Sequence, residues 1–239
     1  MAVDRPPNDP DLSRLVEKQM RNWELARHAR HAKPKAVSAQ MPPVRDFVAI
    51  SRTVASGGRK VAVLVGNRLG WPVFDREILQ AMAGDDRVRA QLYEHMDERD
   101  ESWLEDALHW VIEGELRKDN YFCRLTETVL ALARKGPAIF LGRAADLVLP
   151  RDHGLRVRVI APLEQRVQTF ATLTNTTPAI ARPEVERIDE QRVDFRRHHF
   201  GPHANEDTRH DLLINLGSFT TEQAVELITA ALRIRGLLH

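Results

Sequence analysis

Residues 47–70 read FVAISRTVASGGRKVAVLVGNRLG, and this stretch decides the fold. It opens with a short apolar run, Phe47–Ser51, which is typical of a buried strand. The glycines of Ser56-Gly57-Gly58 interrupt that run. Apolar residues then recur at helical spacing as far as Leu69, and Gly70 marks the end of the helix. A strand, a glycine turn and a helix in this order form the opening unit of a parallel α/β fold.

Four further segments of the chain are candidates for short buried strands. They are Trp71–Phe74, Ala138–Leu141, Leu155–Ile160 and Leu212–Asn215. Short apolar runs of this length suit strands that are buried on both faces. The sequence therefore predicts a three-layer α/β/α domain with a five-stranded parallel sheet and right-handed crossovers. A final amphipathic helix is expected after Thr220, which is a suitable N-cap.

Two helical segments lie outside this simple alternation. Residues 1–45 carry nine Arg or Lys against five Asp or Glu, and they predict an amphipathic helical arm and linker before a main domain at 46–239. The stripe of the arm comprises Leu12, Leu15, Val16, Gln19, Met20, Trp23 and Ala26. A long helical stretch is predicted between Asp85 and Lys135. One face of it carries Trp103, Leu104, Leu108, Val111 and Ile112.

Composition and charge narrow the class of protein. The 239 residues carry 35 Lys or Arg and 34 Asp or Glu, so net charge alone favours neither nucleic acid nor a membrane as a partner. The hydrophobic share of 43% is ordinary for a globular domain. No apolar run approaches the roughly 18 residues that a membrane span needs, and the N-terminus lacks the features of a signal peptide. Cys123 is the single cysteine, which suits a reducing compartment. Together these features predict a soluble, cytoplasmic protein with no membrane partner.

The carboxyl edge of the predicted sheet is where a ligand is expected, because open parallel sheets bind ligands there. Arg52–Lys60, Asp75-Arg76, Gly142-Arg143, Ala161-Pro162 and Asn215–Ser218 would lie at this edge. A glycine turn at a helix N-terminus presents backbone N–H groups and the positive end of the helix dipole to an anion. Arg59 and Lys60 add two cations to that turn. The alternative is a tight strand-to-helix turn that binds no ligand.

The order of these motifs resembles the cytidylate-kinase-like family of P-loop nucleotide kinases. The resemblance rests on a strand ending in Ser51-Arg52, the Ser56-Gly57-Gly58-Arg59 turn, Leu69-Gly70-Trp71-Pro72 and Phe74-Asp75. It continues in Phe140-Leu141-Gly142-Arg143, in residues 156–167 and in Asp211–Asn215. It covers about residues 47–235 and implies a P-loop kinase fold for the main domain.

The resemblance also implies a chemistry. Similar proteins bind ATP with Mg²⁺ on the glycine loop and a pyrimidine nucleoside monophosphate opposite it, and they move the γ-phosphoryl group between the two. By matching position, the donor phosphates would be bound by Ser56, Gly57, Gly58, Arg59 and Lys60. The catalytic cations would be Arg59 and Lys60, together with Arg192 and Arg196 of a mobile lid at about 182–203. The acceptor would be bound by Asp75, Arg76, Arg143 and Arg197, with the helical stretch at about 85–135 as an insertion on the acceptor side.

The lid is also indicated by the residues themselves. Pro183 suits the first position of a helix, and Gly201 suits its end. Arg192 and Arg196 form an i, i+4 pair of like charge, which costs a few tenths of a kcal/mol in an isolated helix. An anion such as phosphate is therefore a natural partner. The alternative is that neighbouring acids such as Asp189 neutralise the two arginines on a solvated face.

The loop departs from the strict GxxxxGK[ST] pattern. Gly58 stands at the position of the lysine, and the hydroxyl that holds Mg²⁺ is missing, so Arg59 or Lys60 would have to supply the charge and Ser56 a hydroxyl. Ala55 replaces a loop glycine, which disfavours a positive φ there. The Gly-Arg-Asp of true cytidylate kinases reads Gly142-Arg143-Ala144 and has lost its carboxylate.

Two functions from different classes therefore stay open. The first is a kinase that phosphorylates CMP, dCMP or a related acceptor with ATP. The second is a catalytically impaired nucleotide-binding protein that binds a protein or ribonucleoprotein partner through residues 1–45. The apolar stripe of that arm could instead pack on the main domain or on a second subunit.

Four histidines near the end of the lid invite a metal hypothesis. They are His198, His199, His203 and His210. Neutral imidazole is a good zinc ligand, but two of these residues are adjacent and no cysteine lies near them. We therefore predict no metal site, and expect phosphate contact or plain solvation for these side chains.

Overall fold

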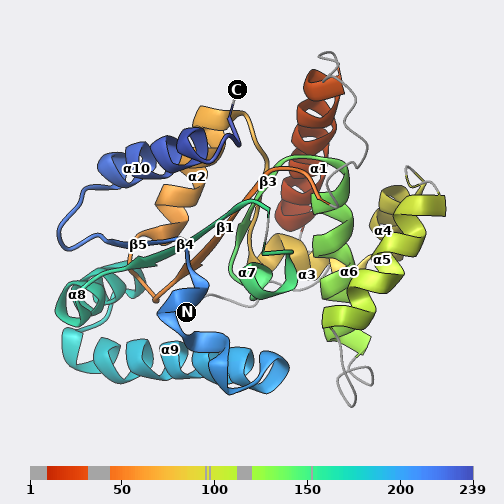
Figure 1. The fold of residues 1–239 in the computed structure, drawn as a ribbon. Helices are drawn as coiled ribbons and strands as arrows, with labels where there is room; N and C mark the ends of the chain where they lie inside the picture. Colours follow the sequence, from red (N-terminus) through yellow and green to blue (C-terminus); the bar gives the residue numbers. More distant parts are fainter. Residues whose placement is uncertain are drawn as a thin grey trace.

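The computed structural model contains one sheet of five parallel strands in the order β2-β3-β1-β4-β5 (Figure 1). The strands are β1 (Phe47–Arg52), β2 (Val73–Phe74), β3 (Ala138–Leu141), β4 (Leu155–Ile160) and β5 (Leu212–Asn215). The structure describes residues 10–31, 44–94, 96, 98–111, 120–151 and 153–238. All five predicted strands are confirmed, although the second is two residues shorter than its apolar run and the first extends to Arg52.

The strand β1 lies at the centre of the sheet. Ala49 pairs with Phe140 of β3 on one side and with Arg156 of β4 on the other. Because successive side chains of a strand point to opposite faces, Val48 and Ile50 belong to one core layer and Phe47 and Ala49 to the other. The loop that follows β1 is therefore held from both faces of the sheet.

Helices α2 (Gly58–Leu69) and α10 (Thr221–Ile234) cover one face of the sheet (Figure 1). The cap predicted at Thr220 is confirmed, because its hydroxyl accepts the backbone N–H of Gln223 at 3.2 Å. The Gln223 side chain accepts the N–H of Thr220 in return, at 2.9 Å. This capping box fixes the start of α10 beside the loop that precedes α2.

Helices α3 (Arg76–Gly84), α6 (Asn120–Lys135) and α7 (Ala145–Val148) lie on the opposite face. With α4 (Asp86–Tyr93) and α5 (Glu98–Val111), α6 makes up the stretch that was predicted to be helical between residues 85 and 135. Asp85 separates α3 from α4 and caps α4 with its carboxylate. Of the predicted apolar face, Leu104 is buried against this core, and Ile112 lies outside the described residues.

Helix α1 (Pro10–His31) packs on the main domain beside α3. Four members of its predicted stripe are buried in the same core as α3 and α6, namely Leu12, Val16, Met20 and Trp23. The Trp23 indole Nε1–H donates to the carbonyl of Leu132 in α6 at 3.1 Å. The Gln19 side chain accepts the N–H of Val73 in β2 at 2.9 Å. The described part of the arm is thus built into the domain, and its linker at 36–43 lies outside the described residues.

Helices α8 (Leu163–Thr174) and α9 (Pro178–Phe200) follow β4, and α9 covers most of the lid region predicted at about 182–203. The prediction that Pro183 begins the lid helix is wrong, since α9 begins at Pro178 and contains Pro183. The internal proline removes one backbone hydrogen bond, which the remaining helix tolerates because its ends are held elsewhere. Gly201 ends the helix as predicted, with φ at 80°. Two short 3₁₀ helices, η2 (Pro202–Asn205) and η3 (Asp207–Arg209), lead from there to β5.

Candidate active site

The turn between β1 and α2 has the backbone of an anion-binding loop. Ala55 and Gly57 both have positive φ, at 55° and 90°, and α2 begins at Gly58. The expectation that Ala55 would avoid a positive φ is therefore wrong. The surrounding contacts hold the alanine there, at a cost on the order of 1 kcal/mol. No side chain caps α2 and its first turn holds no acid, so its N–H groups face the open end of the loop.

Ser56 contributes its backbone and not its hydroxyl. The hydroxyl donates to the carbonyl of Thr53 at 2.9 Å and approaches that of Val159 in β4 at 3.4 Å. The side chain is buried. The hydroxyl that was expected to replace the missing loop serine is therefore used to hold the turn closed.

The two cations of the loop point in different directions. Arg59 extends to the acceptor side, where its guanidinium lies 2.7 Å from the Asp75 carboxylate. The Lys60 ammonium lies 3.6 Å from Glu222 at the start of α10. Both cationic side chains are 64% exposed. Of the two, Arg59 is directed toward the predicted acceptor and Lys60 toward the neighbouring helix.

Asp75 is held rigidly at the end of β2. One carboxylate oxygen accepts the N–H groups of Glu77 and Ile78, both at 3.1 Å, and so caps α3. The other oxygen accepts the ion pair with Arg59. The side chain is buried, so both oxygens are committed and Asp75 fixes the position of a guanidinium group beside the loop.

Arg52, at the end of β1, is a site residue that the sequence reasoning did not select. Its guanidinium lies against Gly142, where an added Cβ would be 2.0 Å from Nη1. No hydrogen bond or ion pair reaches this guanidinium within the described residues. Burial, together with the positive charges of Arg192, Arg76 and Arg59, lowers the pKa of Arg52 to about 9, although Asp75 opposes this shift. A half-buried arginine among other arginines at a helix N-terminus is a strong attractor for an anion.

Helix α9 brings a further arginine to the same place. Arg192 donates to the backbone carbonyl of Arg52 at 3.0 Å. Burial lowers its pKa despite the nearby Asp189. Asp189 in turn accepts the N–H of Val54 at 2.8 Å and the guanidinium of Arg166 in α8 at 2.6 Å. These contacts dock the predicted lid on the loop, with Arg192 facing the site.

Arg196 was predicted to meet a phosphate, and the structure pairs it with a carboxylate instead. Its two terminal nitrogens donate to the two oxygens of Asp146 in α7, each at 2.8 Å. Both side chains are buried, and Arg196 also donates to the carbonyl of Ala204. The i, i+4 pair therefore splits, because Arg196 turns into the core and only Arg192 reaches the loop. We do not place Arg196 among the catalytic residues.

The remaining predicted acceptor residues differ in their surroundings. The guanidinium carbon of Arg143 lies 6.0 Å from the ring centre of Tyr121 in α6 and 5.7 Å from that of Phe195 in α9. The two rings orient it by cation–π attraction, beside Gly142 and Arg52. Arg76 lies within electrostatic range of Arg52 and Arg192. Arg197 is 61% exposed and lies 3.8 Å from Asp194, on the solvent face of α9.

The four histidines do not form one cluster, although the rings of the adjacent His198 and His199 lie edge to face with 4.8 Å between their centres. The ring of His199 stacks on Phe122 at 4.0 Å between ring centres, and His203 pairs with Glu206. The Nε2 of His210 lies 2.8 Å from the Ser51 hydroxyl and 3.5 Å from Asp146. Across the part of the chain that the structure describes, no three His, Cys, Asp or Glu side chains are grouped as metal ligands.

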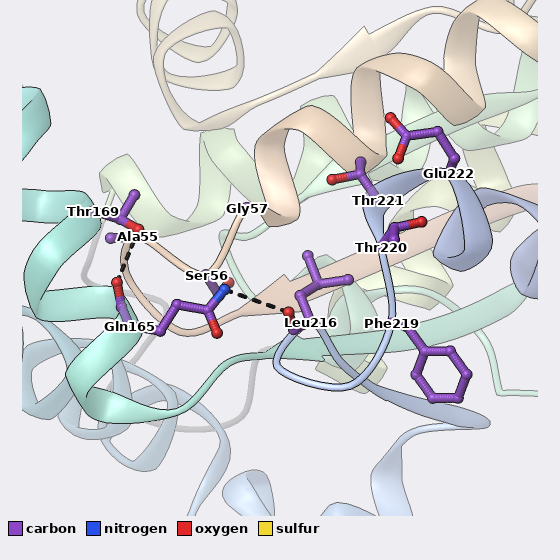
Figure 2. Close-up of a pocket in the computed structure, with 10 residues that line it drawn as sticks. All are labelled: Ala55, Ser56, Gly57, Gln165, Thr169, Leu216, Phe219, Thr220, Thr221 and Glu222. Carbon is purple, nitrogen blue, oxygen red and sulfur yellow. Dashed lines mark hydrogen bonds between the residues drawn. The ribbon is translucent and has the colours of Figure 1, made fainter.

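A pocket of ≈ 300 Å³ lies on the other side of the loop from Asp75. Figure 2 shows its three walls: the loop Ala55–Gly57, the α8 residues Gln165 and Thr169, and the turn from Leu216 to Glu222. The Gln165 amide donates to the carbonyl of Leu216 at 3.4 Å, which links the second wall to the third. Phe219 is 44% exposed at the rim. The pocket joins the loop directly, so one ligand can occupy both.

The fold is a three-layer α/β/α domain with a parallel sheet, and a glycine turn with the backbone of an anion-binding loop stands at the N-terminus of α2. A family model of the cytidylate kinase-like family matches residues 47–218. The chain belongs to the cytidylate kinase-like family, as the sequence motifs predicted.

One solved structure with a TM-score above 0.5 supports the fold, and it supports the fold alone. An uncharacterized protein from Eubacterium ventriosum is 14% identical with a TM-score of 0.61, over 79% of this chain and 99% of that one. A shikimate kinase from Bacteroides thetaiotaomicron is 12% identical with a TM-score of 0.43, over 79% of this chain and 98% of that one.

Among curated proteins, a uronate isomerase from Corynebacterium glutamicum is 32% identical over 102 residues, or 42% of this chain. The chain spans 20% of that curated relative. Among the helices that the structure describes, none has the length and apolar character to cross a membrane.

Proposed function

We propose that this protein transfers the γ-phosphoryl group of ATP to the phosphate of a nucleoside monophosphate, with a pyrimidine nucleotide such as CMP or dCMP as the acceptor. An oxygen of the acceptor phosphate attacks the γ-phosphorus and forms a P–O–P linkage. The bond between the γ-phosphorus and the bridging oxygen breaks, and ADP leaves with the electron pair. The fully ionised substrates and products carry equal total charge, so the step needs no net proton.

One observation carries this proposal, namely the convergence of guanidinium groups beside the N-terminus of α2. Arg52 from β1, Arg59 from α2 and Arg192 from α9 meet at the carboxyl edge of the sheet. Asp75 pairs with Arg59, and Asp189 lies 3.6 Å from Arg192, so two carboxylates offset part of the charge of the three arginines. Phosphoryl transfer requires mainly positioning and charge neutralisation, and arginine suits both because its planar fork binds phosphate oxygens in pairs.

The donor is expected to lie between the loop and the adjoining pocket. The N–H groups of Gly57, Gly58 and Arg59 would bind its phosphates. Its base would occupy the pocket near Gln165, while the Phe219 ring stands at the rim and is turned away from Gln165 (Figure 2). The acceptor would lie on the other side, where Arg59 is paired with Asp75 and Arg143 is held between two aromatic rings. The γ-phosphate would then lie between them, near Arg52.

The side chains at the loop do not match the usual protein ligands of Mg²⁺. The Ser56 hydroxyl donates to a backbone carbonyl, and both oxygens of Asp75 accept hydrogen bonds or an ion pair. In a standard loop a hydroxyl and a carboxylate help to hold this ion. Charge neutralisation at this site is therefore assigned to the arginines. The use of Mg²⁺ with ATP stays a prediction from the family, as does a cytoplasmic location.

The second candidate is a nucleotide-binding protein without turnover. Gly58 at the lysine position is the observation that favours it. Its proposed recruitment of a protein or ribonucleoprotein through residues 1–45 is weakened, because the apolar stripe of α1 is buried in the domain core. A partner would have to bind the exposed face of α1 or the residues that the structure does not describe.

A transfer assay with a panel of acceptors tests the proposed function. Purified protein is incubated with Mg²⁺, ATP and each nucleoside monophosphate in turn, and the diphosphate products are separated by chromatography. We expect transfer to one pyrimidine nucleotide and a strong loss in the Arg59→Ala variant. Arg68→Ala is the matched control, because Arg68 lies on the same helix and pairs with Glu226 away from the loop. ATP binding with no transfer to any acceptor would favour the second candidate.

A further inference from the structure

The loop of this chain contains two departures from GxxxxGK[ST] that concern the same space. The first glycine of the pattern falls on Arg52, and the lysine falls on Gly58. A cation is therefore gained at the end of β1 and lost at the start of α2. Read separately, each change damages the loop, because a glycine is lost in one and the phosphate-binding lysine in the other.

The structure shows that the two changes are coupled. A Cβ added to Gly58 would lie 2.8 Å from the Cβ of Arg52 and 3.2 Å from its Cγ. The stem of Arg52 therefore fills the space in which a side chain at residue 58 would begin. Arg52 continues across the sheet edge to Gly142, which also has no room for a Cβ. The two glycines allow one arginine to pass beneath the loop.

Among the residues that the structure describes, no carboxylate forms an ion pair with the guanidinium at the end of this path. Its pKa is lowered by burial and by Arg192, and Asp75, the carboxylate that opposes this effect, is already paired with Arg59. The two cations on the loop itself are engaged, Arg59 with Asp75 and Lys60 with Glu222. Of these three cations, Arg52 is the one whose charge is left for a ligand.

We propose that Arg52 takes the place of the missing loop lysine and binds the terminal phosphates of the donor from β1. This inference rests on the proposed function for the identity of the donor. Arg52 enters from below the loop, so its guanidinium lies between the N-terminus of α2 and the acceptor side marked by Asp75. That is the position at which charge develops on the transferred phosphoryl group, so Arg52 is a catalytic residue for that step.

The experiment exchanges the two positions. Binding of inorganic tripolyphosphate and of ATP is measured by calorimetry for the wild type, Arg52→Gly, Gly58→Lys and the double variant Arg52→Gly/Gly58→Lys. Melting temperatures show which variants fold, and Arg68→Gly serves as the control for the loss of an arginine outside the site. The transfer assay is run on the same proteins.

Arg52→Gly should weaken tripolyphosphate binding by about 10- to 100-fold, as expected for losing hydrogen bonds from a charged donor. The double variant should regain most of that loss, because lysine at 58 then occupies the space that Arg52 vacates. The inference is overturned if Arg52→Gly folds and binds tripolyphosphate as the wild type does, or if the double variant folds and binds no better than Arg52→Gly. If the double variant regains tripolyphosphate binding but neither it nor the wild type transfers a phosphoryl group, the proposed function is refuted and the role of Arg52 in binding phosphate stands. Transfer that is unchanged in Arg52→Gly would refute the role of Arg52 and leave the proposed function standing.

Discussion

Replacing Arg196 tests whether this arginine stabilises the fold or binds a substrate. Its guanidinium and the Asp146 carboxylate form two hydrogen bonds of 2.8 Å, and both groups are buried. Removing one partner of such a pair leaves the other charge without compensation, which typically costs 3–5 kcal/mol. We therefore expect Arg196→Met and Asp146→Asn each to lower the free energy of unfolding by about 3–5 kcal/mol.

The assay is urea denaturation of the two single variants and of the double variant. The double variant should lose much less than the sum of the two, because removing both charges leaves neither one buried alone. Arg197→Met is a matched control one residue away. Arg197 is exposed, and its ion pair with Asp194 is long, at 3.8 Å. Its loss should therefore change the free energy of unfolding by less than about 0.5 kcal/mol.

The same pair gives a pH dependence. Burial alone would raise the pKa of Asp146, but hydrogen bonds and charge from His210 and Arg196 hold that pKa well below its ordinary value of 3.8. A carboxyl with a lowered pKa in the folded state contributes stability above its unfolded pKa and loses it as the pH falls. The stability difference between the wild type and Asp146→Asn should therefore shrink below about pH 4. An Arg196→Met protein that is as stable as the wild type but no longer binds ATP or CMP would refute this reasoning.

Three further predictions concern other contacts. Trp23→Ala should lower the free energy of unfolding by about 3–5 kcal/mol, because the indole is fully buried, whereas Leu25→Ala on the exposed side of α1 should have little effect. Small and equal effects of the two substitutions in urea denaturation would mean that α1 is not docked on the domain. Gly142→Ala should weaken tripolyphosphate binding in calorimetry, because its φ is 81° and its Cβ would displace the Arg52 guanidinium; wild-type affinity in a folded variant would contradict the placement of Arg52. Asp189→Asn should cost about 1–3 kcal/mol and speed proteolysis within α9, and an unchanged cleavage rate would show that this residue does not dock the helix.

The sequence was informative about the sheet for a physical reason. Strands buried on both faces are mostly apolar, so runs such as Phe47–Ile50 and Ala138–Leu141 are visible without an alignment. Helix limits were harder to place, because they depend on local caps as well as on periodicity. Pro183 illustrates this, since a proline suits a first turn but is also tolerated inside a long helix that other contacts hold.

The candidate site was predicted only in part, because several of its features depend on contacts between distant residues. The loop and Asp75 could be located from motifs that are local in sequence. The partner of Arg196 is 50 residues away, at Asp146, and no spacing rule on a helix reveals it. Arg52 was visible in the motif, but its role depends on the space left by Gly58 and Gly142, which only the three-dimensional structure shows.

The most direct test of the central claim compares two acceptors that differ by one phosphate. The protein is incubated with ATP and either CMP or cytidine, and the formation of ADP is followed with time. Because the arginines converge at the acceptor side of the loop, ADP should form with CMP and not with cytidine, and CDP should appear in equal amount. Equal ADP formation with both compounds, or with neither while ATP is bound, would contradict the assignment of this site to phosphoryl transfer between nucleotides.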